Sequence, residues 1–188
     1  AYALSHRHAL VANFSRIRLE DKTETFSSLT SHNSLGRVYL ETILAKSLRG
    51  GAAVSFGART RIGNQNLFAL YNVNDDYRAE AVNSQSYLTH ETILRSSGIL
   101  TNLADRSLSY TLSATNRRFE GVGVQRENEL KFSLASSINR FQLSHNVQHR
   151  QREYLTARES STSGTQLVRT QIGKVSAGAE VSYEMAPM

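Results

Sequence analysis

The 188-residue sequence contains no cysteine and no tryptophan, and its single proline, Pro187, stands next to the last residue. Without cysteine the chain cannot form disulfides, a cysteine-ligated zinc or iron–sulfur site, or a thiol nucleophile. Without proline before position 187, each preceding residue can donate its backbone N–H to a hydrogen-bonded ladder. No apolar run approaches the roughly 20 residues that a membrane-spanning α-helix needs.

Lysine is also scarce: only four of the 22 basic residues are lysine, and the other 18 are arginine. With 16 acidic residues the formal net charge is +6, a balance that raises nucleic acid as a partner. The basic residues are spread singly along the chain, however, and their longest run is the pair Arg117-Arg118. Nucleic acid is therefore not an expected partner.

The residues that are present alternate with a period of two. From Ala52 to Ile62 the even positions are mainly apolar, whereas the odd positions are small or cationic. Such alternation is typical of a β-strand with two different faces. The same pattern recurs in Leu108–Thr115, Leu130–Ile138, Phe141–Gln148 and Val175–Met185.

Weaker strand patterns fill the intervals, and the length and composition suit one domain over residues 1–188. Leu40–Leu48 could be helical by propensity, but we interpret it as part of a strand because Val38, Leu40, Thr42 and Leu44 alternate. The predicted fold is all-β, an antiparallel up-and-down meander of about ten to twelve strands. The weaker strands are His8–Glu20, Lys22–Leu29, Arg37–Leu48, Asn66–Val73, Tyr77–Ala81, Ser86–Arg95 and Gln166–Ile172.

Short turns separate several of these strands. Gly50-Gly51, Asn139-Arg140 and Gly173-Lys174 have the length and residue types of two-residue hairpin turns. Arg152–Gly164 is polar and is predicted to be a longer loop at the other end of the meander. Short turns at one end and longer loops at the other are expected of an up-and-down sheet.

Alternation leaves two possibilities for the apolar face. A soluble sheet would turn this face toward a core, whereas a transmembrane β-barrel would turn it toward lipid. Strands of ten residues or more suit a tilted membrane strand, and the polar face carries Ser, Thr, Asn, Gln and Arg rather than a Lys/Glu mixture. We therefore expect a transmembrane β-barrel or part of one, with a soluble, basic antiparallel sheet as the alternative.

In its alternation, turn asymmetry and arginine-bearing polar face, the sequence resembles bacterial outer-membrane antiparallel β-barrels over most of its length. The resemblance implies an outer-membrane location and contact with membrane lipid. The final residues, Tyr-Glu-Met-Ala-Pro-Met, lack the terminal aromatic common in that class. This absence suggests a segment of a larger barrel, such as a pilus usher or a polysaccharide-export porin, completed by further strands of a longer chain or by other protomers.

The sequence is expected to hold no catalytic, cofactor-binding or metal site, and hence not to be an enzyme. The pairs His6/His8 and His145/His149 lack a third ligand nearby in sequence. Ser31-His32-Asn33-Ser34 is interpreted as a polar turn rather than a nucleophile and base, and Asn74-Asp75-Asp76 as an ordinary loop.

The remaining functional signal is a set of cations on the polar phase of the strands. In a barrel they would line the lumen and attract anions, and Glu41, Glu180 and Glu184, on the same phase, would pair with some of them. The sequence thus predicts a pore or export conduit for a hydrophilic or anionic cargo. The alternative is a soluble binding or assembly module. The pore-lining candidates are Arg59, Arg61, Arg117, Lys131, Arg150 and Arg152.

Overall fold

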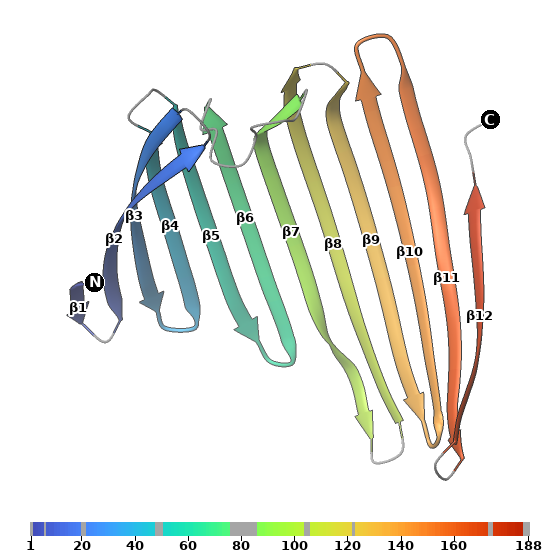
Figure 1. The fold of residues 1–188 in the computed structure, drawn as a ribbon. Helices are drawn as coiled ribbons and strands as arrows, with labels where there is room; N and C mark the ends of the chain where they lie inside the picture. The colour runs from blue at the N-terminus through green and yellow to red at the C-terminus, as the bar shows by residue number, and fades with distance from the viewer. Residues whose placement is uncertain are drawn as a thin grey trace.

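The chain forms one antiparallel sheet in which each strand pairs with its neighbours in sequence, from β1 to β12 (Figure 1). The computed structural model describes residues 2–5, 7–19, 22–47, 51–75, 86–103, 106–121, 123–172 and 175–185. The predicted all-β meander is confirmed. Its strands are β1 (Tyr2–Ser5), β2 (His8–Leu19), β3 (Lys22–Leu35), β4 (Val38–Ser47), β5 (Ala52–Ile62), β6 (Gln65–Asp75), β7 (Ser86–Leu103), β8 (Arg106–Gly121), β9 (Val124–Ile138), β10 (Phe141–Tyr154), β11 (Arg158–Ile172) and β12 (Val175–Met185).

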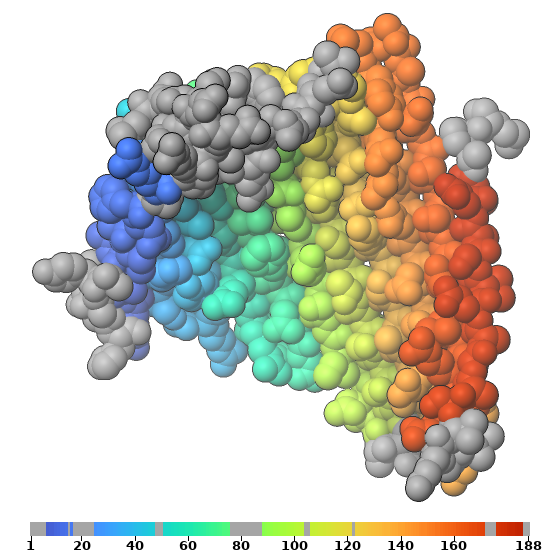
Figure 2. All heavy atoms as spheres, in the orientation of Figure 1, coloured from blue at the N-terminus to red at the C-terminus, as the bar shows by residue number. Residues whose placement is uncertain are grey.

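The sheet is open. Within the described residues, β1 pairs only with β2 and β12 only with β11, and these strands lie at opposite edges of the layer (Figure 1). In Figure 2 the blue residues of β2 and the red residues of β12 likewise lie at opposite sides of the molecule. The described residues therefore do not close into a barrel. Strands β2 to β12 each have ten residues or more, whereas β1 has four.

The sheet consists of a single layer with almost no interior. In the described part of the chain, Phe26 is the only apolar side chain that is fully buried. Large apolar side chains remain exposed along the sheet, from Phe14 on β2 to Met185 on β12. A second layer that would bury one face of a soluble sheet is thus not supplied by the described residues.

The two faces differ as the alternation predicts, and we name them by β5. The apolar face carries Val54, Phe56 and the residues in register with them, and the polar face carries Ser55 and Arg59. One row of the apolar face runs through Ala58, Ala69, Leu94, Ala114 and Leu130. The corresponding row of the polar face runs through Ser55, Asn72, Glu91, Arg117, Glu127, Arg152 and Glu159.

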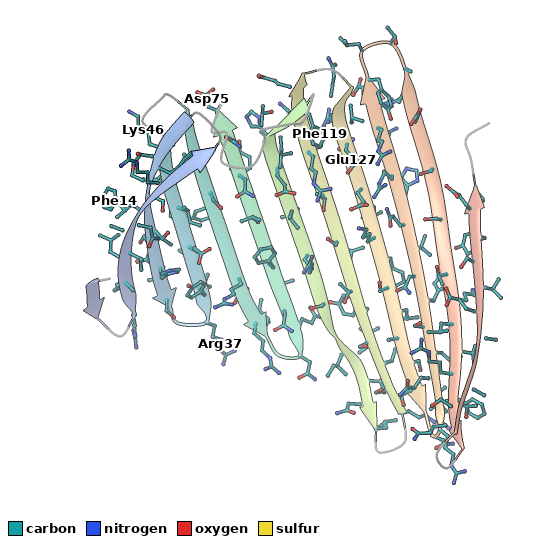
Figure 3. All side chains as sticks on the ribbon, in the orientation of Figure 1. Phe14, Arg37, Lys46, Asp75, Phe119 and Glu127 are labelled. Carbon is teal, nitrogen blue, oxygen red and sulfur yellow. The ribbon has the colours of Figure 1, made fainter. Side chains whose placement is uncertain are left out.

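The connections differ between the two ends of the sheet. At the end that contains Arg37 (Figure 3), five successive hairpins are each joined by two residues: 36–37, 63–64, 104–105, 139–140 and 173–174. The connections at the opposite end, near Lys46 and Asp75, have between two and ten residues. Asn139 has a positive φ of 53°, as its predicted turn requires.

Several local predictions are wrong. Arg152–Gly164 is not a long loop, because β10 and β11 leave only 155–157 between them. Its consecutive residues Ser160–Ser163 all pair with residues of β10, so a polar composition is here compatible with a strand. For the predicted turn Gly50-Gly51, Gly50 lies outside the described residues, and the connection between Ser47 and Ala52 has four residues. The predicted strand Tyr77–Ala81 lies outside the described residues.

Candidate functional site on the polar face

All six predicted pore-lining cations lie in strands with their side chains on the polar face. Arg59 and Arg61 are on β5, and Arg117 is on β8. Lys131 is on β9, and both Arg150 and Arg152 are on β10. The six cations form two groups that differ in whether their charges are paired. Arg117, Lys131, Arg150 and Arg152 belong to a network of ion pairs across β7–β10. Arg59 and Arg61 line a pocket near the turns at 36–37 and 63–64.

The first group is centred on Glu127, which lies opposite Arg117 on β8 and Arg152 on β10. Arg117 donates from Nη1 to Glu127 Oε1 at 3.1 Å and from Nε to Glu91 Oε1 at 2.9 Å. Arg152 Nε donates to Glu127 Oε2 at 2.8 Å. Asn72 adds an amide donor to Glu91 at 3.1 Å, so this row links five strands from β6 to β10.

A second row of the same network lies one step along the strands. Glu129 accepts from Arg150 at 2.8 Å and from Gln148 at 2.7 Å, and it lies 2.9 Å from the ammonium of Lys131. Both Glu127 and Glu129 are buried among these partners, at 8% and 7% exposure. Because carboxylates withdrawn from water need several donors, the network stabilises the register of β7–β10 rather than offering free charge.

The acidic partners differ from those predicted. Glu41, Glu180 and Glu184 do lie on the polar face, but Glu91, Glu127 and Glu129 bind the arginines of β8 and β10. Glu41 instead lies 3.1 Å from His32 Nδ1. The sequence held a signal for two of the missed residues: Glu127, Glu129 and Lys131 alternate on one phase of β9.

The second group is a pocket of about 430 Å³ on the polar face, which we call the arginine pocket. Arg59 and Arg61 contribute from β5, Arg95 from β7 and Arg37 from the turn before β4. The guanidinium carbon of Arg59 lies 4.2 Å from the centre of the Tyr39 ring. No ion pair links these four arginines to a carboxylate in the described ranges, so the pocket has four uncompensated cations.

An apolar strip separates the arginine pocket from the paired network. Leu70 on β6 and Ile93 on β7 are cross-strand partners on the polar face, directly between the row of Arg95 and the row of Glu91. On β7 the positions of Arg95 and Glu91 are four residues apart, about 13 Å along a strand. The two groups of charges are therefore spatially distinct.

Strands contain His8, His145, His149 and the segment Ser31-His32-Asn33-Ser34, whereas His6 lies outside the described residues. His145 and His149 share the apolar face of β10, and they are about 13 Å apart along the strand, too far to bind one metal ion together. Ser31-His32-Asn33-Ser34 belongs to β3, so the predicted turn is wrong. Its pairing with β4 continues through Leu35, and successive side chains point to opposite faces.

The structure also differs from the prediction for the acidic segment at Asn74-Asp75. Asn74 and Asp75 lie at the end of β6, so they are strand residues and the predicted loop is wrong there; Asp76 lies outside the described residues. Among the residues that the structure describes, no three His, Cys, Asp or Glu side chains gather as a metal site would require. A helix long and apolar enough to cross a membrane is likewise not found in the described ranges.

The apolar face ends in a polar border on the longer strands. On β9 it extends from Ile138 to Leu130, about 26 Å along the strand. The next residues on this face are Asn128, which accepts a hydrogen bond from Asn116 on β8, and then Arg126 opposite Arg118. On β8 and β9 the apolar surface thus has a defined edge, with Ser136 as a polar residue inside it.

Comparisons with protein-family models, with curated proteins and with solved structures find no match.

Proposed function

We propose that the chain is a segment of an outer-membrane β-barrel that serves as a pore or export conduit for a hydrophilic, anionic cargo. The observation that carries the proposal is the single-layer sheet with one apolar and one polar, charged face. Lipid would cover the apolar face, which includes Val54, Phe56 and Leu130. Six or more arginine and lysine side chains would then border an aqueous lumen.

The dimensions of the apolar band support this proposal. The 26 Å that it covers along β9 becomes about 20 Å if the strand tilts by 40°, which approaches the apolar band of about 25 Å on membrane barrels. The polar border at Asn128 and Arg126 lies where such a band would meet headgroups. The two-residue connections at one end, and the connections of two to ten residues at the other, also suit a membrane meander.

The open edges require other strands to close the wall. Twelve strands alone would enclose a narrow lumen, largely filled by its arginine and glutamine side chains. We propose that further strands, from a longer chain or from other protomers, pair with the edges at β1 and β12. The conduit is then a property of the completed wall, to which this chain contributes its polar face.

The solubility of the protein with and without detergent tests whether the sheet lies in a membrane. We expect the protein to require detergent and to keep its β circular dichroism on heating there. Planar-bilayer recording of the inserted protein should show discrete anion-favouring conductance, weakened by Arg59→Ser with Arg61→Ser. A monodisperse monomer in plain buffer would overturn the membrane assignment and favour a soluble basic sheet that binds or assembles with a partner. Folded, inserted protein without conductance would restrict this chain to a structural part of the wall.

A further inference from the structure

We propose that the arginine pocket is a binding site for a multivalent oxyanion, such as a chain of linked phosphates. The proposal concerns binding by residues of this chain and does not depend on whether the sheet conducts. It rests on three observations: the convergence of four arginines, the absence of a carboxylate partner for them within the described residues, and their separation from the neighbouring network.

The convergence follows from the strand register. Arg59 on β5 lies opposite Phe68 on β6, which in turn lies opposite Arg95 on β7. Arg61 is two residues further along β5, toward the turn that carries Arg37. Two strands, β5 and β7, and one turn thus direct guanidinium groups to the same pocket of about 430 Å³. Guanidinium groups bind phosphate and carboxylate oxygens in pairs, so several of them favour a ligand with several charged oxygens.

Two contacts hold arginines in position without neutralising them. The Arg59 guanidinium lies over the Tyr39 ring, and Arg61 Nε donates to the carbonyl of Gly63 at 3.1 Å. Neither contact supplies a negative charge, so both cations keep an unmet preference for an anion. The nearby carboxylate of Glu41 binds His32, and Glu91 accepts from Arg117 and Asn72.

The arginine pocket differs from the network of β8–β10 in how its cations are paired. There, Arg117, Arg150 and Arg152 face two buried glutamates, and the charges largely cancel. Cations that were needed only to hold the sheet together would be expected to have partners of this kind. The arginine pocket has the cations without the glutamates, and it also offers hydrogen-bonding groups from Asn66 and Ser97. A soluble oxyanion fits this face better than a lipid headgroup, because the pocket opens opposite the apolar band.

The test is calorimetric titration of the folded protein, in the detergent or buffer that keeps it monodisperse, with inorganic triphosphate at low and at moderate salt. The pocket variant is Arg59→Gln/Arg61→Gln/Arg95→Gln. Its control, Arg118→Gln/Arg126→Gln/Arg158→Gln, removes the same charge from exposed positions on the other face. We expect binding to weaken about tenfold or more in the pocket variant and to stay within about twofold of wild type in the control.

A second variant keeps every arginine. Asn66→Asp places a carboxylate inside the pocket and should also abolish triphosphate binding, so the proposal remains testable if the triple variant does not fold. A parallel titration with micelles containing an anionic phospholipid separates a headgroup from a soluble anion, and we expect no effect of the pocket variant there. If the pocket and control variants lost equal affinity for triphosphate, or if the wild type did not bind it, the proposal would be overturned. If only the anionic lipid bound in a pocket-dependent way, the assignment of a soluble ligand would be wrong.

Discussion

The ring of Tyr183 on β12 lies directly over Gly164 on β11, its cross-strand partner on the apolar face. A Cβ built on Gly164 would be 2.2 Å from the Tyr183 Cζ, so the glycine provides the space that the ring occupies. Glycine normally weakens the interior of a strand, and an aromatic ring packed across it compensates for the missing side chain. This contact fastens the edge strand β12 to the rest of the sheet.

We predict that Gly164→Ala destabilises the folded protein because the ring must move away from the new methyl group. In a Tyr183→Ala background the same substitution should be neutral or stabilising, since alanine loses less backbone entropy than glycine on folding. Urea unfolding of the four proteins should give a coupling free energy of about 1 kcal/mol. Additive effects in this double-mutant cycle would show that the ring and the glycine do not interact.

The network centred on Glu127 predicts a second effect. Glu127→Gln removes the charge that faces both Arg117 and Arg152, and it should lower the free energy of unfolding by roughly 1–3 kcal/mol. Glu180→Gln, at an exposed position of the same face on β12, is the matched control and should change stability by less than about 0.5 kcal/mol. Similar unfolding midpoints for the two variants would contradict a stabilising role for the network.

The turn at Asn139 predicts a third effect. Its φ of 53° is tolerated by asparagine and glycine, whereas a β-branched residue pays a steric cost there. Asn139→Val should therefore lower stability by about 1–2 kcal/mol, and Asn139→Gly should leave it nearly unchanged. Thermal unfolding followed by circular dichroism measures both. If valine were tolerated as well as glycine, the left-handed turn would not be present in solution.

The proposed orientation of the sheet predicts a labelling pattern. Because the natural chain has no cysteine, Phe56→Cys and Arg59→Cys each introduce a single thiol. In membrane-inserted protein, a membrane-impermeant thiol reagent should label position 59 rapidly and leave position 56 unmodified. Rapid labelling at 56 with none at 59 would place the apolar face in water and would contradict the proposed orientation.

Alternation made most of the sheet predictable. The odd and even positions of Ala52–Ile62 separate cleanly, and the predicted strand and its faces agree with β5. The same alternation predicts that Arg59, Arg117 and Lys131 lie on the polar faces of their strands, and the strand pairings confirm this prediction. A period of two fixes the face of a side chain once the strand is identified.

The alternation within each strand does not predict which charged side chains contact one another across strands. Glu127 contacts Arg152, 25 positions later, because β9 and β10 pair with a register that the turn at 139–140 sets. The arginine pocket depends likewise on the registers of β4 through β7, and Arg37 reaches it from a turn. The polar composition of the segment after Arg152 is typical of a loop, yet most of this segment belongs to β10 and β11. Serine and threonine can lie in a strand when the neighbouring strand offers them polar cross-strand partners, as β10 does here.

The strictly sequential pairing of the strands has a consequence for how the sheet loses its structure. Each strand makes its substantial contacts with the strands next to it in sequence, and the described residues provide no common core that all of them share. Stability is then close to a sum of nearest-neighbour terms, as in repeat proteins. Hydrogen exchange should spread inward from the edge strands β1 and β12, and the amides of β8 and β9 should exchange last because the cross-strand ion pairs join them to both neighbours.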